Sequence, residues 1–317
     1  MSANARADAL HAAVAVAILN WNGFDLVKAC IKSLTNLSTR HEVFVVDNGS
    51  EQPEVERLQT ELGVRVVALP RNGGVAYGYN AAIRHAHEQG YAYVLLLNND
   101  TVVVDPAMLD VLLGAARKEA AAVTAPLILD PDGRIFSAGG VITWFGAAVH
   151  LTAPRRTSPY PVDWVDGSAL LVDTRIAVES SLMVEDYFLY WEEVDWCWRL
   201  RRAGQRCIVA PATQIVHVRG ATSTTEQTEY YWLRNGLLFH RLTGSWGQNA
   251  RYLAWYILWT VPRYLVRQGL MRCRPLTATR LLARAIAWNV ADAMSRRSWL
   301  RPPTASARKP SPTQPTT

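Results

Sequence analysis

The stretch Val14-Ala-Val-Ala-Ile-Leu-Asn-Trp-Asn-Gly23 decides the fold, because six apolar residues end there at an Asn-Trp-Asn-Gly turn. A short apolar run bounded by turn residues is typical of a buried strand. Three similar runs follow and alternate with segments of helical periodicity. This alternation predicts an α/β fold with a mostly parallel sheet, whose functional residues lie at the carboxyl ends of the strands. The predicted strands are 14–19, 43–46, 64–69 and 93–97, and the predicted helices are 25–34, 53–62, 76–89 and 106–119.

From residue 120 to about 210 the alternation of strands and helices becomes irregular. Shorter apolar runs occur at 123–129, 168–172 and 207–210. We interpret this region as a second half of the same domain. Beyond Thr225 the sequence becomes helical and aromatic, and after Pro302 it is rich in Pro, Ser and Thr, which predicts a disordered tail.

The positive charge of the chain is concentrated at its C-terminal end. The 317 residues have a formal net charge of +6, but residues 251–317 hold twelve Arg or Lys and one acid, Asp292. The first 250 residues therefore carry about −5. This distribution argues against a basic groove through the folded body, so we expect no nucleic-acid partner.

The cysteines and the N-terminus indicate a reducing compartment. Four cysteines form no CxxC pair and no regular framework, which argues against disulfides and against a structural zinc site. The apolar run at 14–19 is too short for a signal peptide, so secretion is not expected. We expect a cytoplasmic protein. The cysteines are Cys30, Cys197, Cys207 and Cys273.

Polar motifs follow the first two predicted strands directly. Asn20-Trp21-Asn22-Gly23 follows the first, and Asp47-Asn48-Gly49-Ser50 follows the second. A carboxylate at a strand end can accept a hydrogen bond from a pyrimidine N–H or a ribose hydroxyl, and the glycines let backbone amides approach the base. The alternative is turn chemistry alone, which both motifs also favour.

A glycine-rich turn, Arg71-Asn-Gly-Gly-Val-Ala-Tyr-Gly-Tyr-Asn80, opens the helix after the third predicted strand. Free amides at a helix N-terminus, with Arg71 nearby, suit a diphosphate or a ribose. The turn is not GxGxxG, which weakens the case for a dinucleotide-binding dehydrogenase. A plain helix cap is the alternative.

The fourth predicted strand ends abruptly in Asn98-Asn99-Asp100. Asp100 could hold a divalent cation that bridges the two phosphates of a sugar nucleotide, since Mg²⁺ and Mn²⁺ prefer oxygen ligands. The alternative is a capping Asp before Thr101.

The four-residue segment Glu192-Glu193-Val194-Asp195 contains three carboxylates. A carboxylate in such a cluster can act as a general base toward a reacting hydroxyl within hydrogen-bond reach. On a helix Glu192 and Asp195 share a face while Glu193 points elsewhere, so their roles should differ. A structural salt bridge is the alternative for Glu192 and Asp195.

Taken in order, these motifs resemble glycosyltransferase family 2, and among its members the rhamnosyltransferases of polysaccharide and cell-wall assembly. The resemblance extends from about residue 14 to 241. It implies a GT-A fold, an inverting single displacement and a uridine or thymidine diphosphate sugar as donor. The matching segments are NWNG, VVDNGS, NGGVAYGYN, LLLNND, VDGSALLV, FLYWEEVDWCWRLRRAG and IVHVRGATS.

The resemblance also implies a donor site and a metal site. Asp47 would contact the pyrimidine, and Asp100 stands at the last position of the metal-binding DxD motif. The first carboxylate of that motif is replaced by Asn98, which implies weaker binding of the Mg²⁺ or Mn²⁺ cofactor, compensated by the diphosphate and by His217. His217 matches the family's metal-ligand histidine, although a lone His in a strand is more often structural. The residues expected at the nucleotide-sugar are Asn20, Trp21, Asn22, Asp47, Asn48, Arg71, Asn72, Gly73, Gly74, Asn80, Asn98 and Asn99.

The catalytic base and the acceptor site are implied in the same way. The family most often has Glu-Asp at this place and uses the second residue as base, which is Glu193 here. Glu192 is the second candidate, and Asp166 either contacts the acceptor or caps its turn. The residues expected at the acceptor are Glu192, Asp195, Trp164, Asp166, Gly167 and Ser168.

The segment from Arg251 to Arg263 has eleven uncharged residues between its arginines, too few to span a bilayer. Its Trp and Tyr residues beside arginines predict a helix that lies in the membrane interface. The alternative is an amphipathic helix packed on the body.

The expected function is transfer of a sugar, with rhamnose one candidate, from a dTDP- or UDP-sugar to a lipid-linked or polysaccharide acceptor, such as a glycan on polyprenyl diphosphate. We expect a peripheral enzyme at the inner face of the cell membrane. The alternative is a catalytically weak or inactive nucleotide-sugar-binding scaffold protein. The predicted organisation is an N-terminal tail (1–12), a catalytic domain (13–245) with a nucleotide-sugar half (13–119) and an acceptor half (120–245), an amphipathic helical extension (246–300) and a disordered tail (301–317).

Overall fold

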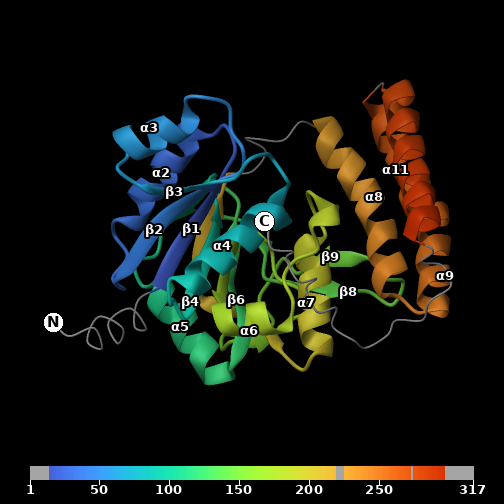
Figure 1. The fold of residues 1–317 in the computed structure, drawn as a ribbon. Helices are drawn as coiled ribbons and strands as arrows, with labels where there is room; N and C mark the ends of the chain where they lie inside the picture. Colours follow the sequence, from blue (N-terminus) through green and yellow to red (C-terminus); the bar gives the residue numbers. More distant parts are fainter. Residues whose placement is uncertain (1–13, 219–224, 273, 297–317) are drawn as a thin grey trace, which may run out of the picture.

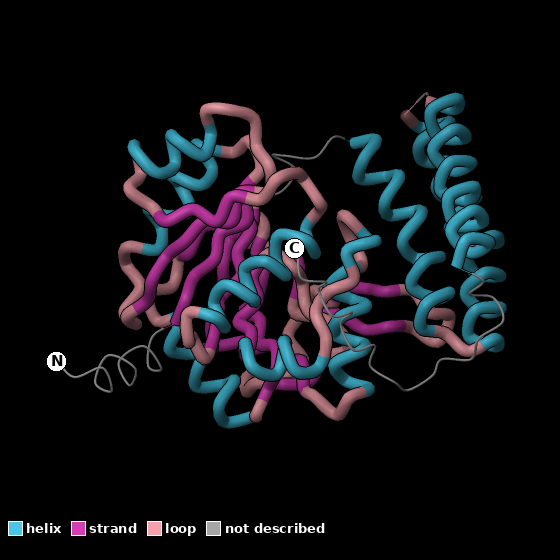
Figure 2. The backbone as a smooth tube through the Cα atoms, in the orientation of Figure 1, coloured by secondary structure: helices cyan, strands magenta, loops and turns pink. Residues whose placement is uncertain are grey.

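A ten-stranded sheet forms the centre of the computed structural model, which describes residues 14–218, 225–272 and 274–296 (Figure 1, Figure 2). The strand order is β10-β12-β6-β11-β4-β1-β2-β3, with β5 beside β12 and β7 beside β6. Strands β8 and β9 form a separate hairpin. The strands are β1 Val14–Asn20, β2 His41–Asp47, β3 Arg65–Ala68, β4 Tyr93–Asn98, β5 Thr101–Val103, β6 Ala121–Leu129, β7 Ile135–Ser137, β8 Gly140–Ile142, β9 Ala148–His150, β10 Tyr160–Pro161, β11 Ala169–Asp173 and β12 Arg206–His217.

Strands β3, β2, β1 and β4 run parallel, as the alternation predicted. The register places Asn20 opposite Asp47, so the polar strand ends meet at one edge of the sheet. Successive side chains of a strand point to opposite faces, and along β1 Val16 faces one apolar core while Ala17 faces the other. Burial on both faces is the reason why these strands are continuously apolar.

Helices cover both faces of the sheet. Helices α2, α3 and α5 pack on one face, and α4, α6 and α7 pack on the other. Every strand and helix predicted before residue 120 is present, with ends within two residues of the prediction. The predicted α/β fold with a mostly parallel sheet is therefore confirmed. The helices are α2 Phe24–Leu34, α3 Glu54–Glu61, α4 Val75–Glu88, α5 Met108–Glu119, α6 Thr174–Ser180 and α7 Glu192–Arg202.

The second half of the sheet contains the antiparallel pairs. Strand β11 lies antiparallel between β4 and β6, whereas β12 runs parallel to β6. The run predicted at 207–210 continues to His217, because a register shift between Val209 and Gln214 lets β12 pair first with β6 and then also with β5. The hairpin β8–β9 lies between α7 and the C-terminal helices (Figure 1). It was not predicted, because each of its strands has only three residues.

The C-terminal helices gather at the end of the molecule away from β1–β3 (Figure 1). Helix α8 connects the two parts, since Phe239 packs in the core above the sheet and Leu233 packs among the C-terminal helices. The predicted boundary at residue 245 follows α8 directly and stays a prediction. The elements are α8 Thr225–Thr243, α9 Trp246–Trp255, the π-helix η2 Tyr256–Thr260, α10 Val261–Tyr264, the π-helix η3 Leu265–Met271 and α11 Pro275–Arg296.

From α9 to η3 a buried line repeats every four residues. In an α-helix of 3.6 residues per turn such a line would rotate by about 40° at each repeat. The π-helical turns of η2 and η3 hold more residues per turn, so they cancel this rotation and keep the buried line facing α8. There the Tyr256 hydroxyl donates to the Leu233 carbonyl at 3.2 Å, and the Tyr264 hydroxyl donates to Glu229 at 3.0 Å. The buried residues are Tyr252, Tyr256, Thr260, Tyr264 and Gln268.

The outward face of the same helices is apolar and exposed. Trp246 is 88% exposed and Leu258 is 75% exposed, and Arg263 and Arg267 are exposed beside them. The segment is thus an amphipathic helix packed on the body that also presents apolar side chains outward. In the described part of the chain, no helix has the length and apolarity needed to cross a bilayer.

Some predictions fall on residues that the structure does not describe. The tails predicted at 1–12 and 301–317 lie outside the described residues, as do residues 219–223 of the IVHVRGATS segment. Of the cysteines, Cys30, Cys197 and Cys207 are described, and all three are buried and free.

Candidate functional site

A cleft of about 340 Å³ opens at the edge of the sheet where β1 and β4 end. The register sets Leu19 beside Asn98, and the residues that follow them, Asn20 at the end of β1 and Asn99 directly after β4, line the cleft. Carboxyl ends of parallel strands are where open α/β sheets place their ligands. The fold therefore brings together the polar strand ends that were predicted to act together.

Asn20 ties three strand ends into one network. Its amide nitrogen donates to Asp47 at 3.1 Å, and its amide oxygen accepts from Asn99 at 3.0 Å. The Asp47 carboxylate also accepts from the backbone and hydroxyl of Ser50 at 2.9 and 2.6 Å. Asp47 is only 1% exposed, so it lies behind the cleft wall and fixes Asn20. Its contact with the pyrimidine stays a prediction.

Asn48 connects β2 to the glycine-rich turn before α4. Its amide nitrogen donates to Asn72 at 3.2 Å and to the Gly74 carbonyl at 3.0 Å, while the Gly73 N–H donates to its oxygen at 3.3 Å. Gly74 has a φ of +87°, and a Cβ there would lie 2.2 Å from the Phe188 carbonyl oxygen. Only glycine allows this close approach. The turn is therefore a preformed wall of the cleft.

Not every predicted donor residue lines this cleft. Trp21 lines it, and Asn22, at a φ of +50°, fastens the turn by accepting from the Glu51 N–H at 2.8 Å. Arg71 is exposed and lies over the Tyr77 ring at 5.0 Å. Asn80 is buried and exchanges hydrogen bonds with the Met183 backbone, both at 2.9 Å. Donor contacts of Arg71 and Asn80 stay predictions, without a lining position to support them.

Asp100 and His217 meet at the floor of the cleft. Pairing of β5 with β12 sets His217 opposite Thr101, and its Nε2 lies 3.0 Å from the Asp100 carboxylate. The His217 Nδ1 is buried with no hydrogen-bond partner in the described structure. A carboxylate beside an imidazole fits Mn²⁺ or Mg²⁺, although the described residues contain no group of three His, Cys, Asp or Glu side chains placed to hold a metal ion. A cation here would need ligands from the donor as well.

Asn98 occupies the position of the missing carboxylate of the DxD motif. Its side-chain oxygen accepts from the Tyr79 hydroxyl at 2.8 Å, and the same hydroxyl lies 3.0 Å from the Gly167 carbonyl. The Asn98 amide is thus part of a link between helix α4 and the turn at 166–168. This position favours alignment of the two walls over direct binding of a cation.

The carboxylates of α7 lie on the opposite side of the cleft. Glu193 lines the cleft, and its Oε2 is buried without a hydrogen-bond partner among the described residues. Glu192 is 5% exposed, and its Oε2 is likewise unpaired there. Asp195 accepts from Arg199 at 2.7 Å, and Arg199 donates to the Leu182 carbonyl at 2.9 Å. Asp195 therefore braces the helix, and its acceptor role stays a prediction.

Burial changes the protonation of the two glutamates. Desolvation, followed by the charge of Asp166, raises the pKa of Glu192 to about 7. Desolvation, followed by the charges of Glu192 and Asp166, raises the pKa of Glu193 well above its usual range. Because the carboxyls repel each other's charge, they lose their protons as a set. Groups with such shifts are typical of general acids and bases.

The turn at 166–168 faces Glu193. A Cβ added at Gly167 would lie 3.8 Å from the Cβ of Glu193. Asp166 lines the cleft, and its carboxylate accepts from the Ser168 N–H at 3.0 Å and from the Ser168 hydroxyl at 2.5 Å. Trp164 is 3% exposed and lies behind the turn, with its indole N–H 3.4 Å from the Val141 carbonyl. Asp166 therefore lines the cleft, whereas Trp164, Gly167 and Ser168 do not.

Two residues of α8 were missed by sequence reasoning. The Asn235 amide nitrogen lies 2.9, 2.7 and 2.7 Å from the carbonyls of Tyr187, Leu189 and Tyr190, and the Arg234 guanidinium donates to the Tyr187 carbonyl at 2.7 Å. These contacts hold the loop that leads into α7. The loop needs support because Phe188, Tyr190 and Trp191 all have positive φ. The only signal in the sequence was a consecutive polar pair within an aromatic helix.

The same loop joins the glycine-rich turn before α4 to the segment that carries Glu193. The first N–H of α4, at Val75, donates to the Phe188 carbonyl at 2.7 Å. Glu193 follows five residues later on α7. The remaining cleft-lining residues that were not predicted are Leu19, Val75, Phe136, His150, Phe188, Leu189, Tyr190 and Gln227.

Comparison with protein families gives one match. A family model described as "Glycosyl transferase family 2" matches residues 15–158. This region contains the strand ends, the glycine-rich turn and Asp100, whereas Glu193 and His217 lie beyond it.

Two relatives are named as sugar transferases. The chain is 27% identical over 262 residues to N-acetylglucosaminyl-diphospho-decaprenol L-rhamnosyltransferase of Mycobacterium tuberculosis, covering 73% of this chain and 85% of the relative. It is 22% identical over 209 residues to dTDP-rhamnosyl transferase RfbF of Shigella flexneri, covering 63% and 70%.

Two solved structures share the fold. GalNAc-T7 with UDP, GalNAc and Mn²⁺ superposes with a TM-score of 0.56 at 15% identity, covering 78% of this chain and 56% of that one. The mannosyltransferase PcManGT of Pyrobaculum calidifontis, in complex with GDP-Man and Mn²⁺, has a TM-score of 0.52 at 12% identity, covering 90% and 79%. The predicted GT-A fold is thus confirmed.

Proposed function

We propose that the chain is a glycosyltransferase of family 2 and that it moves a hexose from a dTDP- or UDP-sugar to a lipid-linked glycan with inversion. We take rhamnose as the leading sugar, because the similar enzymes are named rhamnosyltransferases. One observation carries the proposal: Asp100 and His217 line the same cleft as Glu193, whose Oε2 has no hydrogen-bond partner among the described residues.

Glu193 serves as the base. An acceptor hydroxyl beside it gives its proton to a carboxylate oxygen, and the hydroxyl oxygen bonds to the anomeric carbon as the bond from that carbon to the diphosphate breaks. The absence of a side chain at Gly167 leaves space next to Glu193 for the acceptor. Attack from the face opposite the leaving group inverts the configuration at the anomeric carbon.

The raised pKa of Glu193 has two consequences for this role. A carboxylate with a high pKa is a stronger base than an exposed one. Its deprotonated fraction grows with pH, so the reaction rate should rise with pH through the apparent pKa of the carboxyl set.

Asp100 and His217 would hold the divalent cation. When bound, the cation supplies positive charge that stabilises the departing nucleoside diphosphate. Asp100 is 7% exposed, so it is held in place by its surroundings before any ligand arrives. The preformed wall of Asn48, Asn72 and Gly74 would hold the nucleotide.

The acceptor is proposed to be presented at a membrane surface. The apolar outward face of α9 and η2, with arginines beside it, has the composition of an interfacial helix. We place the protein at the inner face of the cell membrane on this basis.

The base assignment is tested by replacing Glu193 with Gln, which keeps the shape and removes the basic group. We expect kcat to fall roughly a thousandfold with little change in donor KM. Glu193→Asp should retain part of the activity, because Asp is the commoner residue in the family. The measurement is nucleoside diphosphate release with Mn²⁺, together with the anomeric configuration of the product by NMR.

Glu179→Gln is the matched control, because Glu179 is an exposed helical glutamate paired with Arg175. Equal release by wild type and Glu193→Gln would refute the base assignment. No release from either, despite nucleotide binding, would favour the inactive scaffold. A panel of dTDP- and UDP-sugars should identify the donor by the largest rise in thermal midpoint.

A further inference from the structure

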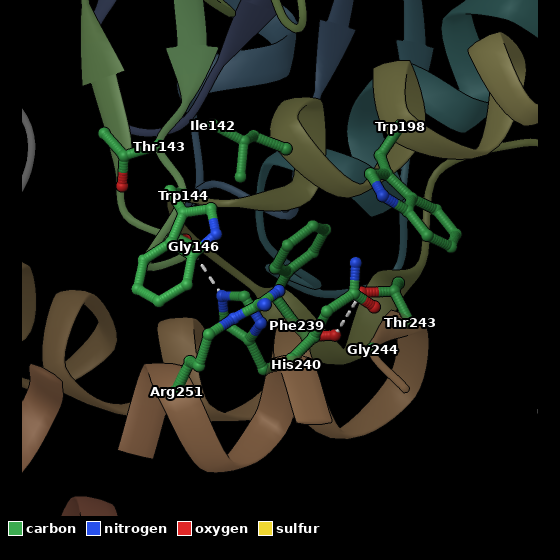
Figure 3. A pocket seen from close by; sticks show the side chains of 11 residues that line it. Ile142, Thr143, Trp144, Gly146, Trp198, Phe239, His240, Thr243, Gly244 and Arg251 are labelled. Carbon is green, nitrogen blue, oxygen red and sulfur yellow. Dashed lines mark hydrogen bonds between the residues drawn. The ribbon is translucent and has the colours of Figure 1, made fainter. Parts of the chain in front are cut away.

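A second pocket, of about 230 Å³, lies between the hairpin β8–β9, helix α7 and the junction of α8 with α9 (Figure 3). It shares no lining residue with the cleft that holds Glu193. Its walls include the aromatic rings of Trp144, Trp198 and Phe239 and the polar groups of Thr143, Gln248 and Arg251.

The wall between hairpin and helix is preformed. The His240 Nε2 lies 2.9 Å from the Gly146 carbonyl, and the imidazole stacks on Tyr252 at 3.9 Å. Gly146 has a φ of +91°, and a Cβ there would lie 2.3 Å from the His240 ring. Burial lowers the pKa of His240 to about 4, so this wall is uncharged at neutral pH.

Arg251 is the only charged residue that lines the pocket. Its guanidinium lies 4.6 Å from the centre of the Trp144 ring, and its Nε is buried with no hydrogen-bond partner in the described residues. No carboxylate lines the pocket to neutralise it. A planar guanidinium with free donors matches the geometry of a phosphate group. A neutral sugar would leave this charge without a counterion.

Exposed aromatic residues surround this site along the chain. Trp144 is 68% exposed and Phe145 is 47% exposed at the tip of the hairpin, and Trp246, two residues before Gln248, is 88% exposed. Large exposed aromatic side chains beside arginine are typical of surfaces at the headgroup level of a bilayer. The molecule that carries the phosphate is therefore best explained as an amphiphile, with an apolar part next to these aromatic side chains.

We propose that the pocket binds the phosphate headgroup of a membrane phospholipid, with Arg251 as the anion's partner and Trp144 and Phe145 in the headgroup layer. The inference rests on the membrane part of the proposed function and makes it more specific. The β-hairpin and α9 then form one membrane-binding surface from parts of the chain about a hundred residues apart.

The test is sedimentation of the full chain with phosphatidylcholine vesicles, with and without phosphatidylglycerol. The wild type should bind the anionic vesicles, and Arg251→Gln should weaken that binding about fivefold. Trp144→Ala, on the exposed hairpin, should weaken it as well. Arg117→Gln is the matched control, since Arg117 is an exposed arginine of α5 over the Tyr93 ring at 5.9 Å. It should bind like the wild type.

Equal binding by Arg251→Gln and Arg117→Gln, with unchanged thermal midpoints, would overturn the proposal. A second result would also overturn it. If inorganic phosphate raised the thermal midpoint of the wild type but not of Arg251→Gln, and both proteins bound the vesicles equally, the pocket would bind free phosphate instead of a lipid headgroup. Arg251→Gln should keep wild-type nucleoside diphosphate release. If the wild type released no nucleoside diphosphate from any donor, the proposed function would be refuted, whereas the proposal that the pocket binds a phospholipid headgroup would be unaffected.

Discussion

At the scale of single residues, the protein keeps a buried carboxyl, Glu192, beside its proposed base. In the folded protein the pKa of Glu192 is about 7, above its ordinary value of 4.5. Between pH 4.5 and about 7, Glu192 is therefore mostly protonated in the folded protein and mostly ionised in the unfolded protein. The contribution of this group to stability is fully present below pH 4.5 and is lost as pH rises through 7.

Glu192→Gln should therefore stabilise the protein in a pH-dependent way. Gln keeps the shape of the protonated carboxyl and cannot ionise, so we expect about 1–3 kcal/mol more stability than wild type near pH 8 and little difference near pH 4. Urea unfolding at both pH values measures this. A difference of the same size at both would contradict the pKa argument. Glu179→Gln, at an exposed position, should show no such trend.

Asp100 gives a second prediction at this scale. Asp100→Asn removes the carboxylate next to His217, so the Mn²⁺ concentration for half-maximal binding should rise by about tenfold or more. Titration calorimetry of Mn²⁺ in the presence of a nucleoside diphosphate measures this apart from turnover. Asp110→Asn removes the same charge from the exposed surface of α5 and is the control. An unchanged Mn²⁺ affinity in Asp100→Asn would exclude Asp100 as a ligand.

At the scale of elements, helix α8 supports the loop that leads to the proposed base through Asn235. Asn235→Ala removes the donor to the Leu189 and Tyr190 carbonyls and leaves the Tyr187 carbonyl without one of its donors, since Arg234 still bonds to it. We expect about 1–3 kcal/mol lower stability and a fall in kcat of roughly tenfold, because Glu193 loses its position. Urea unfolding and nucleoside diphosphate release on the same samples separate the two effects.

Asn289→Ala is the matched comparison for this experiment. Asn289 is a buried asparagine of α11 that donates to the Arg234 and Ala285 carbonyls and not to the loop. It should lower stability and leave kcat per folded molecule nearly unchanged. If Asn235→Ala behaved in the same way, Asn235 would be structural only.

The sequence predicted the elements of the first half well, for a physical reason. The buried strands and amphipathic helices before residue 120 are local patterns that the neighbouring segments reinforce. The hairpin β8–β9 is held by contacts with distant segments, such as Gly146 with His240. The periodicity of apolar residues in a sequence does not reveal contacts between distant segments.

The sequence placed part of the candidate site in one cleft. Asp100, His217 and Glu193 were expected in one site, and all three line one cleft. The left-handed backbone at Phe188, Tyr190 and Trp191 could not be foreseen, since bulky residues rarely adopt it without tertiary support. For the same reason the roles of Arg234 and Asn235 emerged only from the fold.

At the scale of the whole molecule, the exposed apolar face of the C-terminal helices should attach the protein to membranes. Replacing Trp246, Leu253 and Ile257 together with Ser should weaken binding to anionic vesicles by tenfold or more, because about 0.8 kcal/mol is lost per buried CH₂. Flotation measures the change. Val104→Ser with Val178→Ser, at exposed positions outside these helices, is the control. Unchanged flotation of the triple variant would refute the membrane-facing role.

The four-residue repeat from Tyr252 to Gln268 has a consequence for how this extension can evolve. Deleting or inserting one residue inside the repeat turns every later side chain by about 100° around the helix axis. Tyr264 would then leave Glu229, and Gln268 would turn outward. Substitutions that keep a side chain's bulk preserve the line, whereas changes of length break it. Descendants of this sequence should therefore conserve the spacing of the segment more strictly than the identity of its residues.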